Sequence, residues 1–133
     1  MKNIIIAMLW LSLIACREEE TLSAQSTPLV GSWVLTEQKV GIGPPGVWED
    51  VSNGSVLDLR ANGTFAGIGS CSPRSYRSTQ NSITFTFDCP SDTIDHRDEL
   101  SYEITEFTQD HMIITPTTYI CFEGCEYKYT RID

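Results

Sequence analysis

The strongest constraint on the fold is a two-residue alternation of apolar and polar side chains in short segments. In residues 82–88, SITFTFD, the apolar positions are Ile83, Phe85 and Phe87, and residues 99–105, ELSYEIT, repeat the pattern. Because successive side chains of a strand point to opposite faces, this alternation predicts strands that bury one face. No segment after residue 28 has a convincing helical period, so we expect an all-β domain.

Turn signals separate about eight short strands at intervals of about 8 to 12 residues, which is typical of an antiparallel barrel or sandwich. Residues 41–50 and 69–81 are expected to be loops, because the first contains three Gly and two Pro and the second is polar. Tight turns such as Asn62-Gly63 join consecutive strands and favour a small up-and-down barrel. The expected strands are 32–40, 55–60, 64–68, 82–88, 99–105, 111–117 and the two segments that flank Glu123-Gly124.

The first 15 residues predict a secretory signal peptide that is removed. Lys2 supplies a positive charge, and residues 4–15 are apolar except for Ser12. This run is shorter than the roughly 20 residues that a helix needs to cross a bilayer, and it matches the short apolar region of a signal. The alternative is a buried N-terminal helix or strand, but the amphipathic period of a surface helix is missing.

The end of this run, Leu13-Ile14-Ala15-Cys16, resembles the lipobox of bacterial lipoproteins. The resemblance implies cleavage before Cys16, attachment of acyl chains such as palmitate to that residue, and a firm membrane anchor. The next residue is Arg17 rather than the Asp that resembles an inner-membrane retention signal, so we expect the outer membrane. Arg17, Glu18, Glu19 and Glu20 resemble an export signal, which implies exposure at the cell surface, with the periplasmic face as the alternative.

Removing residues 1–15 from the 133-residue chain leaves 118 residues, which is enough for one domain. Residues 16–28 contain the lipidated Cys and a polar, charged segment that predicts a flexible acidic tether, and residues 29–133 form the barrel domain. Loss of Lys2 changes the formal net charge from −9 to −10. Without a cluster of Lys and Arg, we expect no binding to nucleic acid.

The four remaining cysteines, Cys71, Cys89, Cys121 and Cys125, predict disulfides in an exported protein. Four cysteines allow three pairings. Geometry favours Cys71 with Cys89, at the ends of expected neighbouring strands, and Cys121 with Cys125, across the last turn. A zinc site is the weaker alternative, because such sites prefer two closely spaced pairs.

Gly31-Ser32-Trp33 at the first strand and Arg131 near the end of the last strand resemble the lipocalin pattern. The resemblance implies a closed barrel in which the first and last strands are neighbours and Trp33 plugs one end. Arg131 would then stack on the indole, a contact of about 0.5–2 kcal/mol. The segments LVGSWVLTE, LDLRANGTF and YKYTRI extend the resemblance to small lipocalin-like domains of bacterial lipoproteins, over residues 29–133.

This chain departs from the lipocalin pattern in three ways. It is shorter, it lacks the long helix beside the barrel, and its four cysteines are not part of the general pattern. A second family, the META-type domains of exported bacterial proteins, is resembled by FAGIGSC and FDCP. The Gly-Cys-Asn and the helix usual in that family are missing here, so it is the alternative.

The sequence contains no strong sign of catalysis or of a cofactor. It has no Gly-x-Ser-x-Gly motif, and its two histidines, His96 and His111, have no spacing that supports a catalytic triad. The acidic run at residues 92–99 lacks the calcium-loop pattern, so we expect no metal site. The expected protein is therefore a non-catalytic binding module, with a hydrolase as a remote third hypothesis.

The aromatic residues could form a solid core or line a cavity, and the short barrel favours a core. Trp48 is the first candidate for a ligand or partner contact, because it lies in the loop that would border the mouth of a lipocalin-like barrel. Phe65, Tyr102 and Tyr127 are the other candidates. The expected function is binding of a small hydrophobic molecule or a protein partner at the cell envelope. The alternative is a structural or interaction domain of a surface complex that takes no small ligand.

Overall fold

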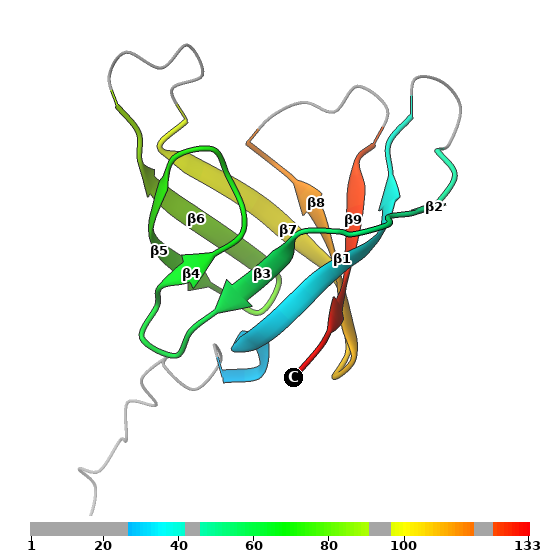
Figure 1. The fold of residues 1–133 in the computed structure, drawn as a ribbon, viewed down its shortest axis with the longest axis horizontal. Helices are drawn as coiled ribbons and strands as arrows, with labels where there is room; N and C mark the ends of the chain where they lie inside the picture. Colours follow the sequence, from blue (N-terminus) through cyan, green and yellow to red (C-terminus); the bar gives the residue numbers. More distant parts are fainter. Residues whose placement is uncertain (1–26, 42–45, 91–96, 119–123) are drawn as a thin grey trace, which may run out of the picture.

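The structure, a computed structural model, describes residues 27–41, 46–90, 97–118 and 124–133 (Figure 1). A short 3₁₀-helix, Thr27–Leu29, leads into the first strand. The strands in these residues are β1 (Gly31–Lys39), β2 (Glu49–Asp50), β3 (Val56–Leu59), β4 (Phe65–Ala66), β5 (Ser72–Ser78), β6 (Ser82–Asp88), β7 (Glu99–Phe107), β8 (His111–Pro116) and β9 (Glu126–Arg131). No helix in the same residues is long and apolar enough to cross a membrane.

All strand pairs of the sheet are antiparallel, in the order β4-β3-β1-β9-β8-β7-β6-β5, and β2 pairs with the far half of β1. Tyr76 on β5 links the two ends of this order. Its backbone N–H donates to Gly63 O at 2.8 Å and its hydroxyl donates to Arg60 O at 2.9 Å. The sheet therefore curls into a nearly closed barrel (Figure 1), and the predicted all-β up-and-down architecture is confirmed.

The sequence alternation is visible in the burial of the strands. On β6, Ile83, Phe85 and Phe87 are buried, while the polar residues between them are partly exposed. β8 alternates in the same way, with Met112 and Ile114 inside. Burial of one face therefore fixes which side of each strand points into the barrel.

Two segments that were expected to be loops contain strands. β5 lies within residues 69–81, and most of its side chains are exposed, so no apolar alternation marks it in the sequence. Backbone pairing with β6 holds it in place instead. β2 lies within residues 41–50, and both of its side chains are exposed while it pairs with β1.

The expected strand 64–68 is reduced to the two residues of β4. Gly67 ends it with a φ of +95°, a conformation that L side chains rarely adopt. β4 pairs with β3, and β5 rather than β4 pairs with β6. The expectation that segments 64–68 and 82–88 are paired neighbours is therefore wrong.

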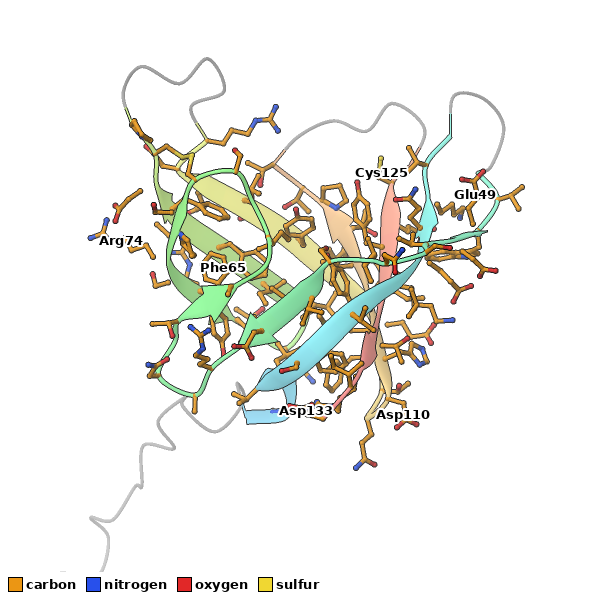
Figure 2. All side chains as sticks on the ribbon, in the orientation of Figure 1. Glu49, Phe65, Arg74, Asp110, Cys125 and Asp133 are labelled. Carbon is orange, nitrogen blue, oxygen red and sulfur yellow. A yellow bond between two sulfur atoms is a disulfide. The ribbon has the colours of Figure 1, made fainter. Side chains whose placement is uncertain are left out.

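Aromatic rings fill the middle of the barrel, where Phe65 is labelled in Figure 2. The Phe65 ring centroid lies 4.9 Å from that of Phe85 and 5.3 Å from that of Phe87. The Phe85 and Tyr102 centroids are 5.9 Å apart. Tilted and edge-on pairs at these distances are favourable for aromatic side chains. The buried core consists of Leu29, Trp33, Leu57, Leu59, Phe65, Ile83, Phe85, Phe87, Tyr102, Ile104, Met112, Ile114 and Tyr129.

Candidate functional site

One end of the barrel is closed by Trp33, which is completely buried. β1 and β9 pair so that Trp33 is directly opposite Arg131. The guanidinium carbon of Arg131 lies 4.1 Å from the centroid of the indole ring. The indole Nε1 donates a hydrogen bond to Leu29 O at 3.0 Å, so the polar edge of the ring is satisfied inside the protein.

The Arg131 side chain joins separate segments at this closed end. Its Nε donates to Gln109 O at 2.9 Å, Nη1 to Val30 O at 2.9 Å and Nη2 to Pro28 O at 2.6 Å. Gly31 leaves the room that this arrangement needs, because a Cβ there would lie 2.4 Å from Nη1. The three residues of the predicted plug are therefore in contact.

An open hollow of about 540 Å³ lies outside this plug. Arg131 and Asp133, which are 3.5 Å apart at their closest charged atoms, form part of its wall. Because the guanidinium is already bonded to backbone carbonyls, we assign this end to closure of the barrel rather than to ligand binding.

The opposite end holds a pocket of about 210 Å³, called the mouth pocket here. Its described lining comes from residues 68–71 after β4, Phe87 on β6, Leu100 and Tyr102 on β7, and Arg97 just before β7. Phe87 and Tyr102 are buried, Leu100 is half-buried and Arg97 is exposed. The pocket therefore lies over buried aromatic rings, and its lining includes polar groups of the 68–71 loop and the exposed Arg97.

Two glycines let the loop after β4 approach the pocket closely. Gly69 has a φ of +84°, and a Cβ there would lie 2.3 Å from the Phe87 ring. A side chain at Gly67 would clash with the backbone instead, because its Cβ would lie 1.6 Å from Val56 O. Larger residues at these positions would push the loop off the pocket.

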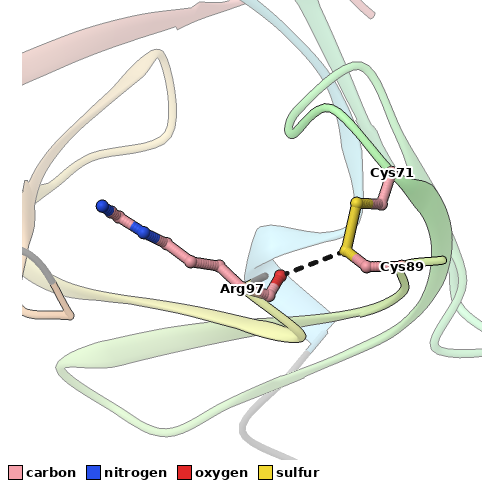
Figure 3. The surroundings of a disulfide bond; sticks show 3 residues. All are labelled: Cys71, Cys89 and Arg97. Carbon is pink, nitrogen blue, oxygen red and sulfur yellow. Dashed lines mark hydrogen bonds between the residues drawn. A yellow bond between two sulfur atoms is a disulfide. The ribbon is translucent and has the colours of Figure 1, made fainter. Parts of the chain in front are cut away.

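A disulfide joins Cys71, which lines the pocket, to Cys89 (Figure 3). Their Cα atoms are 5.1 Å apart, next to the paired residues Ser72 and Asp88 of β5 and β6. The predicted pairing is confirmed, although the strand that carries Cys71 toward Cys89 is β5 rather than β4. Cys89 Sγ also lies 3.4 Å from Arg97 O, so the disulfide is next to the segment that leads into β7 beside the pocket.

Of the second predicted cysteine pair, only Cys125 is among the described residues. Cys125 is buried, and it is disulfide-bonded. Cys121 lies outside the described residues, as do Cys16, Arg17, Glu18, Glu19 and Glu20.

The four predicted contact residues occupy different places. Tyr102 lines the mouth pocket. Phe65 is buried in the core and does not line the mouth pocket. Tyr127 is half-buried against the core, and Trp48 is half-buried on the β1–β2 hairpin.

Sequence reasoning did not select Phe87, Leu100 or Arg97 as site residues. Two signals pointed to their surroundings: the glycine-rich segment before Cys71, and the position of Phe87 two residues before Cys89. Neither signal shows that these segments meet at one pocket, because β4 and β6 are far apart in the sheet order and come near each other only where β5 closes the barrel.

The β1–β2 hairpin, at the same end as the mouth pocket, carries a small apolar patch. Val47 is 76% exposed and Val40 is 50% exposed. Trp48 follows Val47 in the sequence, and Lys39 Nζ lies 5.9 Å from its ring centroid. Val40, Val47 and Trp48 are called the hairpin patch below.

His111 is the first residue of β8 and follows the β7–β8 turn at the closed end. Its Nε2 is 2.5 Å from Glu106 Oε1, and its Nδ1 is 3.0 Å from Thr108 Oγ1. The same Thr108 oxygen accepts the His111 backbone N–H at 3.0 Å, which is the geometry of a side chain that stabilises a turn. His96 lies outside the described residues. In the part of the chain that the structure describes, no group of three or more His, Cys, Asp or Glu could hold a metal ion.

Comparison with known proteins gives no match for this chain among family models, curated proteins or solved structures.

Proposed function

We propose that this chain is a lipid-anchored, lipocalin-like lipoprotein of the bacterial outer membrane that binds a small hydrophobic molecule in the mouth pocket. The observation that carries the proposal is the pocket itself. It lies at the end of the barrel opposite the plug and has Phe87, Leu100 and Tyr102 in its walls. Concave sites lined by aromatic and aliphatic side chains with few polar groups are the usual form of a ligand site.

The volume of the pocket restricts the size of the ligand. Drug-sized molecules occupy sites of about 300–1,000 Å³, whereas the mouth pocket measures about 210 Å³. Below it, the aromatic core around Phe85 fills the barrel. The proposed ligand is therefore compact, such as a single ring or a short chain, rather than a long acyl chain.

The location follows from the N-terminal sequence. The lipobox at Leu13-Ile14-Ala15-Cys16 supports an acylated Cys16, and the residues after it support the outer membrane and exposure at the cell surface. A surface position would bring the pocket into contact with small molecules outside the cell.

Methyl NMR of the full-length protein in lipid nanodiscs tests the ligand site. With benzene and indole as probes, we expect saturable shifts at the Ile68 and Leu100 methyls and none at Leu57, which is buried near the closed end. Leu100→Trp, which fills the pocket, should abolish the shifts. Ile113→Trp adds the same side chain on the outer face of β8 and should retain them. Wild-type methyls that respond to neither probe would sink the proposal.

A protein partner is the second candidate function, and the hairpin patch favours it. Val47 and Val40 are strongly exposed there, and Trp48 follows Val47 in the sequence. Contiguous exposed apolar surface is what marks an interaction site. Cross-linking on whole cells compares wild type with a Val47→Ser, Trp48→Ala variant. We expect the variant to lose a partner that a Val56→Ser control retains, and equal capture by both variants would count against the patch.

A further inference from the structure

The plug also fixes the point at which the N-terminal segment joins the barrel. Leu29 is buried, and its carbonyl accepts the indole N–H of Trp33 at 3.0 Å. The preceding carbonyl, Pro28 O, accepts a hydrogen bond from Arg131 Nη2 at 2.6 Å. Figure 1 shows Thr27–Leu29 beside the C-terminus, at the closed end of the barrel. A membrane anchor on the N-terminal segment would therefore hold the barrel by its closed end.

The proposed anchor is close to this point in the sequence. Eleven residue steps lead from Cys16 to Thr27. A chain of that length spans at most about 40 Å, whatever its conformation. The mouth pocket lies at the other end of strands such as β7, whose nine residues extend over about 27 Å. The anchor therefore favours an orientation in which the closed end is nearer to the lipid than the mouth pocket.

The closed end also presents apolar side chains to the outside. Phe107 packs against Trp33, with ring centroids 6.1 Å apart, and is still 38% exposed. It lines the open hollow outside the plug together with Pro28 and Val30. Ile132, at the end of the chain, is 55% exposed. Exposed apolar surface that gathers in one place is a feature of protein and membrane contact sites.

The charged side chains at this end restrict the kind of lipid that it can meet. Asp110 and Asp133 lie there (Figure 2). The guanidinium of Arg131 is already bonded to backbone carbonyls and lies 3.5 Å from Asp133, so it is not available to a lipid phosphate. An anionic lipid surface would therefore repel this end, whereas a neutral surface would not.

We infer that the closed end of the barrel faces the membrane, where Phe107 and Ile132 contact neutral lipid, and that the mouth pocket opens away from it. The inference rests on the part of the proposed function that acylates Cys16, and it does not depend on a ligand in the mouth pocket. Because the anchor keeps the domain near the bilayer, even a weak contact is populated. A ligand would then enter the pocket from the aqueous side.

Paramagnetic lipid tests this orientation. The acylated protein is placed in phosphatidylcholine nanodiscs that contain a lipid with a nitroxide on its headgroup, and methyl NMR signals are recorded. We expect the Val30 and Ile132 signals to lose intensity, because both residues are at the closed end. The signals of Ile68 and Val47, at the mouth end, should keep their intensity.

The composition of the lipid provides a second test. Adding phosphatidylglycerol, which is anionic, should restore part of the Val30 and Ile132 intensity, because Asp110 and Asp133 are then repelled by the surface. An equal or larger loss of intensity with this lipid would count against the proposed contact.

Two variants test the contact itself. Ile132→Asp places a charge in the proposed contact and should reduce the loss of intensity at Val30. Val56→Asp is the matched control, because Val56 is 45% exposed but pairs with Val34, at the end of β3 that is remote from Gly31. The control should keep the full loss at Val30. Unchanged methyl signals from the core show that both variants still fold.

The outcomes separate the inference from the proposed function. If Ile68 and Val47 lose as much intensity as Val30 and Ile132, the orientation is overturned while the anchor and the ligand site stand. If the acylated protein shows no loss at Val30 and Ile132, the lipid contact is overturned and this surface is left to a protein partner. If the protein carries no acyl chain and does not enter nanodiscs, the proposed anchor falls and the inference falls with it.

Discussion

At the closed end, the guanidinium of Arg131 combines a stacking contact on Trp33 with hydrogen bonds to backbone carbonyls. We expect Arg131→Met to lower the free energy of unfolding by about 2–4 kcal/mol, because both kinds of contact are lost and carbonyls are left unpaired. Urea denaturation measures the change.

The matched control is Arg77→Met, since the Arg77 side chain is 72% exposed and lies 3.3 Å from Glu99. Exposed pairs contribute little, so the control should change stability by less than about 1 kcal/mol. Similar losses in the two variants would show that the stacked geometry has no special value.

Tyr129 predicts how stability depends on alkaline pH. Burial raises the pKa of its phenol above the ordinary value of 10.0, proximity to Tyr127 raises it further, and a hydrogen bond with Ser55 opposes the shift. Because folding raises this pKa, the folded state holds the proton more tightly. The stabilising contribution is therefore complete below pH 10 and is lost as the pH rises through the folded-state pKa.

We expect the free energy of unfolding to fall above about pH 10, and Tyr129→Phe to reduce that slope. Urea titrations between about pH 8 and pH 11 measure both slopes. Near pH 8 the difference in free energy of unfolding between variant and wild type should not change with pH. If the substitution leaves the alkaline slope of that free energy unchanged, the assignment to Tyr129 is contradicted.

Among the elements, the loop after β4 has the tightest fit to its surroundings. We expect Gly69→Ala to destabilise the protein, because its φ is +84° and the new Cβ would meet the Phe87 ring at 2.3 Å. Gly124→Ala separates the two causes, since Gly124 also has a positive φ of +75° but nothing lies within 4 Å of its Cβ position.

Denaturation midpoints should show that Gly69→Ala costs about 1–3 kcal/mol more than Gly124→Ala, the range for a forced overpacking. The Gly69 variant should also weaken ligand binding in the mouth pocket. Equal effects at the two glycines would mean that the loop simply moves away from Phe87.

The burial of side chains decides which strands can be predicted from the sequence. β6 and β8 bury every second residue, so their alternation identifies them. β5 and β2 are held by backbone pairing while their side chains stay mostly exposed, and pairing leaves no mark in composition. Both were therefore taken for loops.

The candidate site was predictable only in part for a related reason. The closed end depends on two residues of the first and last strands, Trp33 and Arg131, and closure of a barrel makes those strands neighbours. The mouth pocket combines a loop, a disulfide and Arg97, whose meeting depends on the position of β5. That position was unknown without the fold.

For the whole molecule, the proposed anchor is tested by changing Cys16. We expect Cys16→Ser to abolish labelling of the protein by isotopically labelled palmitate, because no thiol remains to carry an acyl chain. Immunoprecipitation from labelled cells measures the change. A Cys16→Ser protein that is labelled as strongly as wild type would refute the anchor.

Replacing Glu18, Glu19 and Glu20 with Ala tests the export signal separately. This variant should remain in the membrane fraction but become less accessible to protease added to whole cells. Unchanged cleavage on intact cells would show that these residues are not needed for surface exposure. It would not affect the proposed lipid anchor.

The pairing of the first strand with the last also sets the order in which this barrel can be completed during synthesis. Trp33 is fully covered only once Arg131 on β9 packs against it. The hydrogen bond from Arg131 to Val30 O joins residues that are 101 positions apart in the sequence. Contacts this remote make all-β proteins slow folders, on a scale of about milliseconds to seconds. β3 can pair with one edge of β1 early, but the other edge waits for β9. If the chain is exported N-terminus first, as proposed, that edge stays open until the final residues emerge.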